Sequence, residues 1–297
     1  LESLRDQLAP FGKRLLFWSD FVTDHPAVAS RIPREFVAAS WCYERRADYA
    51  PLVRPLRDAG LDVVVCPGTI NWNRVFPNLD TALPNIQGFC REGQRSGAIG
   101  AITCVWNDNG DAPFALNWYA LYYGAAAAWQ EGEADLGRFS RAFDWALYRN
   151  PGREVAEAFD SLASVHRLVQ SIRPTDANLE LFWLHPLEGI PERQLMSAVE
   201  PVAHPMRLAA EHALERCARA RERAGRNTDL LSPLEFAAHR FEAMGTRARI
   251  ARRVPALYQR LLEQVAAGAP RGDATRTVAD IQQWVADGLE EIVALGA

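Results

Sequence analysis

The stretch Leu61-Asp-Val-Val-Val-Cys66, followed by Pro67-Gly68, decides the fold class. Its apolar residues are nearly continuous, which is typical of a parallel strand that is covered on both faces. Similar runs occur at residues 13–19, 35–43 and 98–106. The chain therefore predicts four strands of the kind found in parallel sheets.

Helical patterns separate these runs and complete the prediction. One helix is expected from about residue 49 to 59, ended by Gly60, and another from about 83 to 96, ended by Gly97. Further helices are expected over 1–10 and 113–131. Alternating strands and helices indicate an α/β architecture.

The pattern changes after about residue 137. Apolar residues at helical spacing, mixed with many Arg and Glu residues, predict helices over 137–172, 193–225, 232–268 and 273–295. We expect a first domain over 1–135 and an all-α helical domain over 136–297.

Composition excludes several classes of function. The chain has 297 residues, 48% hydrophobic and 24% charged, with a net charge of −4. It has no basic footprint for nucleic acid and no apolar stretch of membrane-spanning length, so neither partner is expected. No Gly-rich phosphate loop follows a strand, so no nucleotide cofactor is expected.

Cysteine usage bears on metal binding and on location. The five cysteines form no CxxC pair and no Cys/His cluster at zinc spacing, so no metal site is expected. Their odd number and apolar surroundings favour reduced thiols and a cytoplasmic location. A secreted location stays open, because the first residue is Leu1 rather than Met.

Tryptophans stand where the predicted strands end, each beside a carboxylate or carboxamide. In a (β/α)₈ barrel the active site lies at these ends. Aromatic rings pack on the apolar faces of pyranose rings, while acids and amides bind hydroxyl groups. The candidate substrate-binding residues are Trp18, Asp20, Trp41, Tyr43, Trp72, Asn73, Trp106 and Asp108. The alternative roles are core packing for a tryptophan and helix capping for Asp20 and Asp108.

Several motifs together carry a family resemblance. They are Leu16-Phe-Trp-Ser-Asp20 with His25-Pro26, Ser40-Trp-Cys-Tyr-Glu44, Cys66-Pro-Gly-Thr-Ile-Asn-Trp-Asn-Arg74 with Asn85-Ile86, Gly100-Ala-Ile-Thr-Cys-Val-Trp-Asn-Asp108, and Tyr123-Gly-Ala-Ala-Ala-Ala-Trp129. In this order they resemble the last four strand–helix units of family 20 glycoside hydrolases, the β-N-acetylhexosaminidases. The resemblance covers roughly 40% of the chain and implies the second half of a (β/α)₈ TIM barrel.

The resemblance also implies a reaction and a ligand. Such enzymes remove terminal N-acetylhexosamine with retention, the substrate's own acetamido oxygen acting as nucleophile beside a carboxylic general acid. Trp18, Trp41, Trp72 and Trp106 would wall the acetamide pocket, and Asp108 would hold sugar hydroxyls. The expected partner is a glycan or glycoside that contains N-acetylhexosamine.

Two departures from the family pattern limit this expectation. The family's catalytic Asp-Glu pair follows the fourth barrel strand, so we expect it upstream of Leu1, and this chain alone should be inactive. The family's Tyr after strand seven is replaced by Asn71-Trp-Asn73, and Tyr43 is the candidate substitute.

A half-barrel of four units would leave sheet edges and an inner face uncovered. The alternative function is therefore a non-catalytic sugar-binding or regulatory half-barrel that self-associates, as a homodimer. An open sheet packed on the helical domain and a barrel hydrolase of another hexosaminidase family also remain alternatives.

Overall fold

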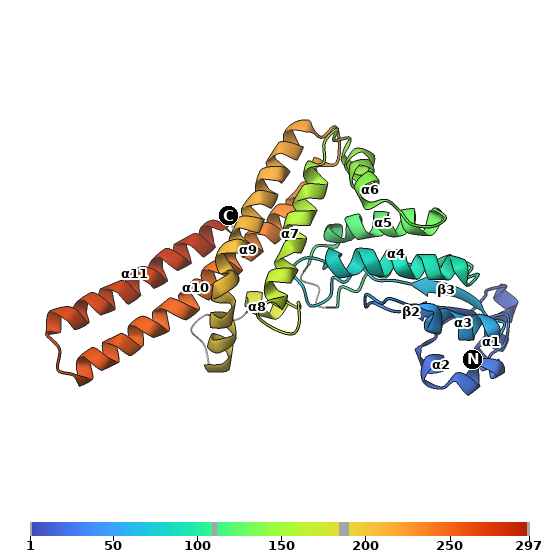
Figure 1. Cartoon of the computed structure of the whole chain (residues 1–297), viewed down its shortest axis with the longest axis horizontal. Coiled ribbons are helices and arrows are strands. Elements are labelled where there is room, and N and C mark those ends of the chain that lie inside the picture. The colour runs from blue at the N-terminus through green and yellow to red at the C-terminus, as the bar shows by residue number, and fades with distance from the viewer. Residues whose placement is uncertain (1, 109–111, 184–189, 296–297) are drawn as a thin grey trace. The chain divides into compact units, whose positions relative to one another are not determined.

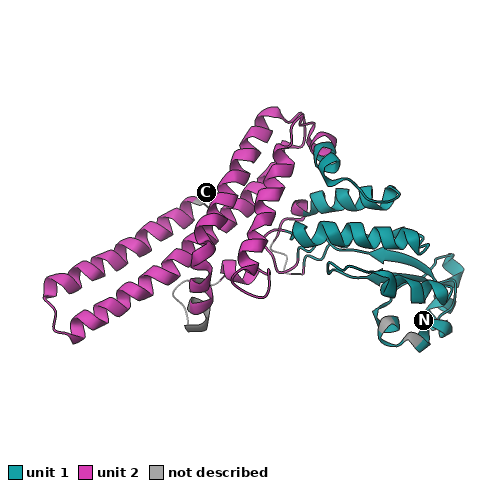
Figure 2. Ribbon diagram, in the orientation of Figure 1, with its two compact units in different colours: residues 1–71, 77–107, 117–143 teal, residues 72–76, 108–116, 144–297 magenta. Residues whose placement is uncertain are grey.

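A computed structural model describes residues 2–108, 112–183 and 190–295 (Figure 1). The chain divides into two compact units, coloured separately in Figure 2. The first unit comprises Leu1–Asn71, Pro77–Asn107 and Asn117–Phe143, and the second comprises Trp72–Phe76, Asp108–Leu116 and Asp144–Ala297.

The first unit is built on a parallel sheet of four strands. They are β1 (Leu16–Trp18), β2 (Val37–Trp41), β3 (Asp62–Cys66) and β4 (Gly100–Ala101), in the spatial order β1-β2-β3-β4. Every neighbouring pair is parallel. Each strand lies within a predicted apolar run, and the strands are parallel and alternate with helices, which confirms the predicted α/β class.

Helices precede, connect and follow these strands, and α3 and α4 pack on them. They are α1 (Glu2–Leu8), α2 (Asp20–Asp24), α3 (Ala50–Asp58), α4 (Leu79–Arg95), α5 (Trp118–Trp129) and α6 (Leu136–Phe143), with 3-10 segments over Ala9–Phe11, Pro26–Arg31 and Phe114–Asn117. Asn78 caps α4 by accepting a hydrogen bond from the Thr81 backbone N–H at 3.1 Å. Gly60 and Gly97 follow α3 and α4 with φ of 80° and 70°, which confirms the predicted helix ends.

The main core of this unit lies on one face of the sheet, against α3 and α4. Its buried members include Phe17, Ala38, Val63 and Val65 from the strands, Val53 and Leu56 from α3, and Phe89 from α4. The opposite face carries a smaller cluster of Val37, Ala39, Val64, Cys66 and Cys104, against which Tyr43 packs.

The prediction that strands are covered on both faces is wrong for β1. Phe17 is buried, but its neighbours Leu16 and Trp18 are 45% and 40% exposed. The physical reason is position: β1 is an edge strand, and only the side chain that points toward the helices meets a packed layer.

The second unit is helical. Its elements are η4 (Asp144–Tyr148, a π-helical turn), α7 (Glu154–Gln170), α8 (Leu179–Trp183), α9 (Ile190–Arg223), a 3-10 segment over Thr228–Leu231, α10 (Ser232–Ala266) and α11 (Arg271–Leu295). Helix α9 packs on α7 and α10, and α10 packs on α11 (Figure 1). The expected helical tail is present, and the segment over 137–172, where helical spacing was expected, holds α6, η4 and α7 rather than one continuous helix. Arg149, at φ 54°, and the following Asn-Pro-Gly sequence interrupt it between η4 and α7.

No helix within the described ranges is both long enough and apolar enough to cross a bilayer. All five cysteines are buried with free thiols.

Candidate functional site

The first unit brings four of the predicted aromatic residues together at the carboxyl ends of its strands. Trp18 ends β1, Trp41 ends β2, and Tyr43 and Trp106 follow β2 and β4. The rings of Trp18 and Trp106 lie 6.0 Å apart at 52°, and those of Trp41 and Tyr43 stack at 5.1 Å and 29°. We call these four residues the aromatic cluster.

Hydrogen bonds orient the rings of the aromatic cluster. Trp106 Nε1 donates to Tyr43 Oη at 2.7 Å, which joins the two ring pairs. Trp41 Nε1 lies 3.4 Å from Asp20 Oδ1, a long hydrogen bond. The indoles of Trp41 and Trp106 are 41% and 37% exposed, close to the value for Trp18. Each ring is therefore held in place while part of its apolar surface faces solvent.

The Tyr43 side chain contacts two cysteine thiols. It packs against Cys66 and Cys104 on the sheet face away from α3 and α4. Burial raises the pKa of the Tyr43 phenol above its usual value, so the hydroxyl stays protonated. A hydrogen bond between the thiols, together with burial, raises the pKa of Cys66, whereas the bonds from Cys66 and Tyr43 lower that of Cys104. Tyr43 thus serves as a neutral hydroxyl.

Two buried asparagines hold the loops beneath the cluster. Asn71 Oδ1 accepts hydrogen bonds from Thr69 Oγ1 at 2.8 Å and from the Trp106 backbone N–H at 3.3 Å. Asn85 on α4 donates to the carbonyls of Cys42 and Glu44 at 2.9 and 3.0 Å. Its Oδ1 accepts from the Gly68 N–H at 3.1 Å. These amides tie the end of β2 to the loops after β3 and β4.

The sequence did not predict a positioning role for Asn71 or Asn85. Asn85 was noted only as part of a family motif, and Asn71 only as the residue before Trp72. A polar residue in an otherwise apolar helix pattern, as at Asn85 between Leu83 and Ile86, is the signal that could have found the first of them.

Asp20 is not the N-cap of α2, contrary to one alternative considered for it. Ser19 holds the N-cap position and Asp20 begins the helix. The carboxylate faces solvent and meets Trp41, so it is placed as a hydrogen-bond acceptor at the rim of the aromatic cluster.

Trp72, Asn73 and Asp108 belong to the second unit, so the aromatic cluster as described does not include them. The Trp72 carbonyl accepts a 2.7 Å hydrogen bond from Arg74 Nη1, and the Arg74 guanidinium lies 5.7 Å from the Trp72 ring centre. Asn73 adopts φ 57°, and its carbonyl accepts from the backbone N–H groups of Asn178 and Leu179. Asp108 is exposed.

A buried ion pair that the sequence did not suggest anchors this same segment. Arg74 donates from Nε and Nη2 to the two oxygens of Asp176 at 2.6 and 2.7 Å. His166 Nδ1 lies 3.5 Å from the same carboxylate, and burial lowers the pKa of His166 to about 4. Asn178 Oδ1 accepts from the Val75 N–H at 2.8 Å. Residues 73–75, which belong to the second unit, are therefore positioned by Asp176 and Asn178 of the same unit.

The aromatic cluster offers indole faces, the neutral Tyr43 hydroxyl and the Asp20 carboxylate. These groups are suited to bind a ligand that has apolar faces and hydroxyl groups. Among the residues that the structure describes, no group of three or more His, Cys, Asp or Glu side chains is arranged to hold a metal ion.

A scan against protein-family models finds no match, and a search of curated proteins finds no significant match.

Proposed function

We propose that this chain supplies the second half of a (β/α)₈ barrel in a β-N-acetylhexosaminidase of the family 20 type, and that its aromatic cluster forms walls of the acetamido-sugar pocket. The single observation that carries the proposal is the contact chain from Trp18 through Trp106 and Tyr43 to Trp41, at the carboxyl ends of parallel strands. Substrate sites of barrels form at these ends.

The sheet supports the half-barrel part of this proposal. Its strands run β1-β2-β3-β4 in chain order, as consecutive strands of a barrel do. Helices α3 and α4 pack on one face, and the other face carries mainly small residues such as Ala39 and Cys66. One helical layer outside and a side-chain layer inside is the arrangement of such barrels.

The chemistry of the cluster supports an N-acetylated sugar as ligand. Indole faces bind the apolar faces of a pyranose and its acetamido methyl group, while the Tyr43 hydroxyl and the Asp20 carboxylate offer polar partners beside them. In the proposed enzyme the substrate's acetamide is the nucleophile, and the acid and the carboxylate that orients the acetamide come from the Asp-Glu pair expected outside these residues.

Ligand binding tests the proposal directly. Saturation-transfer NMR with the purified chain should detect N-acetylglucosamine more strongly than glucose, which lacks the acetamido group. Trp41→Ala should weaken binding about tenfold, the factor that ~1.4 kcal/mol of aromatic contact represents. Trp129→Ala is the matched control, because this indole on α5 is 92% exposed. Equal binding of both sugars, or an equal effect of the two variants, would contradict the proposal.

Catalysis gives a second test. The purified chain should not hydrolyse aryl N-acetylglucosaminides, because the expected catalytic pair is absent from its residues. Turnover that scales with purity and survives both Asp20→Ala and Asp108→Ala would overturn the site assignment.

A second candidate is a non-catalytic sugar-binding half-barrel that self-associates. The observation that favours it is the exposed apolar sheet surface away from α3 and α4, where Leu16 and Ile102 are 45% and 41% exposed. Sedimentation separates the two candidates: a stable dimer that binds N-acetylglucosamine without cleaving it supports self-association, and a monomer argues against it.

A further inference from the structure

Helices α10 and α11 form a long antiparallel hairpin within the second unit (Figure 1). Thr277 on α11 donates from Oγ1 to Gln264 Oε1 on α10 at 2.9 Å. Further along, Gly288 lies so close to Ile250 that a side chain at this glycine would overlap it. These two contacts fix the register in which α11 runs back along α10 from the turn over residues 267–270.

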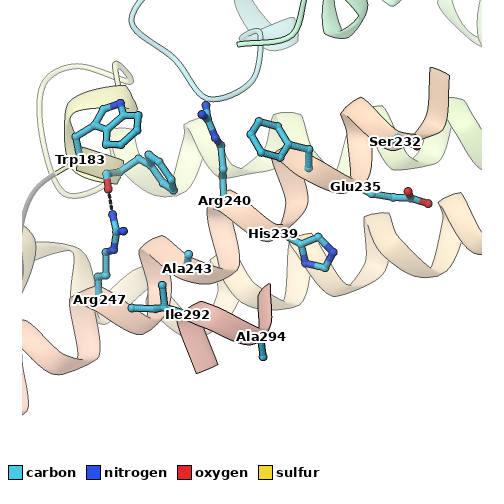
Figure 3. A pocket seen from close by; sticks show the side chains of 11 residues that line it. Trp183, Ser232, Glu235, His239, Arg240, Ala243, Arg247, Ile292 and Ala294 are labelled. Carbon is cyan, nitrogen blue, oxygen red and sulfur yellow. Dashed lines mark hydrogen bonds between the residues drawn. The ribbon is translucent and has the colours of Figure 1, made fainter. Parts of the chain in front are cut away.

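The base of the hairpin is covered by other helices of the same unit. Ile292 of α11 lines a cavity together with Ala243 of α10 and Trp183 of α8 (Figure 3). Arg207 of α9 forms an ion pair with Glu291 of α11 at 2.9 Å. Near its C-terminal end α11 therefore has neighbours besides α10.

Toward the turn, the contact between the two helices stays open. Leu257 and Thr277 are buried there, but Leu261, Ile281 and Val285, which follow at helical spacing, are only half-buried. A single pair of helices leaves its contact open at the sides, and four-helix bundles enclose such residues with a second pair. The open contact therefore favours another pair of helices as the partner of this surface.

Beside this contact, each helix carries exposed apolar side chains. They are Tyr258, Leu262 and Val265 on α10 and Val278 and Leu289 on α11, and they are between 39% and 66% exposed. We call these five residues the hairpin face. Exposed apolar residues that gather on one surface, rather than singly, are typical of an interaction site.

The hairpin face lies on one side of the helix pair. Its members directly follow residues of the α10–α11 contact, which are Leu257, Leu261, Gln264, Thr277 and Gly288. One residue along an α-helix is a rotation of about 100° in a fixed sense. Because the two helices are antiparallel, the same rotation turns both sets of side chains toward the same side of the pair. They form one apolar surface rather than two separate stripes.

The absence of formal charge on the hairpin face indicates what it can bind. Over 258–265 and 274–289 the charged side chains turn, by helical spacing, to other sides of the helices; they are Arg260, Glu263, Arg276, Asp280 and Asp287. Two copies of an uncharged face can meet without like-charge repulsion, and a face that binds its own copy gives a closed two-fold dimer. Helices that lie on membranes instead carry mainly Lys and Arg on their polar side. The mixed charges of this hairpin favour a second copy.

We propose that the hairpin face binds the hairpin face of a second copy of this chain, so that two helix pairs complete a four-helix arrangement. This contact removes side chains such as Leu262 and Val278 from water and closes the open contact between α10 and α11. The surface belongs to the second unit alone. The proposal is therefore independent of the aromatic cluster and of the sheet surface through which a half-barrel would self-associate.

Analytical ultracentrifugation of the whole chain and of Leu262→Glu and Val278→Glu tests the proposal. The unmodified chain should be a dimer. Each variant should raise the dissociation constant of the dimer at least about a hundredfold, because the dimer then buries two unpaired carboxylates at a cost of about tenfold or more each. Both side chains are exposed in the single chain, so the variants should fold, and circular dichroism checks this.

Ala256→Glu is the matched control, because Ala256 is exposed on α10 outside the hairpin face and the change in charge is the same. It should leave the dimer intact. Leu16→Glu on β1 should also leave it intact, which separates this dimer from one formed through the sheet. A monomeric unmodified chain, a dimer that survives both hairpin variants, or a dimer that only Leu16→Glu dissociates would overturn the proposal. A monomer that binds phospholipid vesicles and loses this binding in Leu262→Glu would overturn it in favour of a membrane surface.

Discussion

Trp106 Nε1 donates a 2.7 Å hydrogen bond to Tyr43 Oη, joining the loop after β4 to the loop after β2. The bond spans 63 residues of sequence and connects the two aromatic pairs of the cluster. Tyr43 is therefore a candidate sugar-binding residue that also fixes the position of Trp106 in the candidate site.

Tyr43→Phe should therefore loosen Trp106 and weaken N-acetylglucosamine binding several-fold. It should lower the free energy of unfolding by about 1 kcal/mol, the usual net contribution of one hydrogen bond. Urea unfolding and NMR titration measure the two effects. Tyr122→Phe is the control, because Tyr122 makes ring contacts with Trp118 and Phe143. A Tyr43→Phe variant that matches this control in both measurements would show that the hydroxyl has no organising role.

The Arg74–Asp176 pair should be far more important for stability than an exposed ion pair. Both side chains are about 10% exposed and meet through two hydrogen bonds. Asp176→Asn should lower the free energy of unfolding by about 3–5 kcal/mol, because it leaves a buried guanidinium without a counter-charge.

The exposed pair of Arg276 and Asp273 on α11 provides the comparison. Asp273→Asn should change the free energy of unfolding by less than about 1 kcal/mol. Urea denaturation of both variants measures the difference, and similar losses in the two would contradict the assigned role of Arg74 and Asp176.

His166 should make the protein less stable as the pH falls from about 6.5 toward 4. Its pKa is lowered to about 4 in the folded state from a model-peptide value of 6.5, so in this interval the unfolded chain binds a proton that the folded chain does not. The contribution is present above pH 6.5 and amounts to about 3 kcal/mol. His166→Gln should remove this part of the dependence. Unfolding free energies at pH 4.5 and 7, with NMR titration of the imidazole, measure it, and a folded-state pKa near 6.5 would refute it.

Asp144 should make the protein less stable as the pH rises, which is the opposite of the effect of His166. Burial raises the pKa of its carboxyl to about 6, although Asn150 and the backbone N–H groups of Val155 and Ala156 donate to it at 2.9 Å. The folded chain then binds a proton that the unfolded chain has lost between pH 4 and 6. Its contribution to stability is present below pH 4 and is lost as the pH rises to 6, by about 3 kcal/mol. Carbon-13 NMR of the Asp144 carboxyl tests this, and a midpoint below 4 would refute it.

Much of the α/β unit could be predicted because its signals are local. The apolar runs located all four strands, and Gly60 and Gly97 marked helix ends through their left-handed backbone conformation. The break between η4 and α7 was not predicted, because the left-handed conformation of Arg149 and the hydrogen bonds from the Val155 and Ala156 N–H groups to Asp144 form only in the folded chain.

The candidate site was predictable in kind but not in detail. The apolar runs placed Trp18 and Trp41 at strand ends, and the ends of neighbouring parallel strands lie side by side in the sheet. The partners of the indole N–H groups and the positioning roles of Asn71 and Asn85 depend on loop paths, which no periodic pattern encodes.

The sequence by itself determined a parallel α/β unit followed by helices, and tryptophans at the strand ends, because these features follow from residue spacing within single elements. Only the tertiary structure decided that Trp106 bonds to Tyr43, that Arg74 pairs with Asp176 across 102 residues, and that Arg240 and Arg247 both lie against the Phe182 ring. The physical reason is that such contacts join segments far apart in the chain. The geometry of these contacts depends on how whole helices and strands pack, and the spacing of residues within one element does not specify that packing.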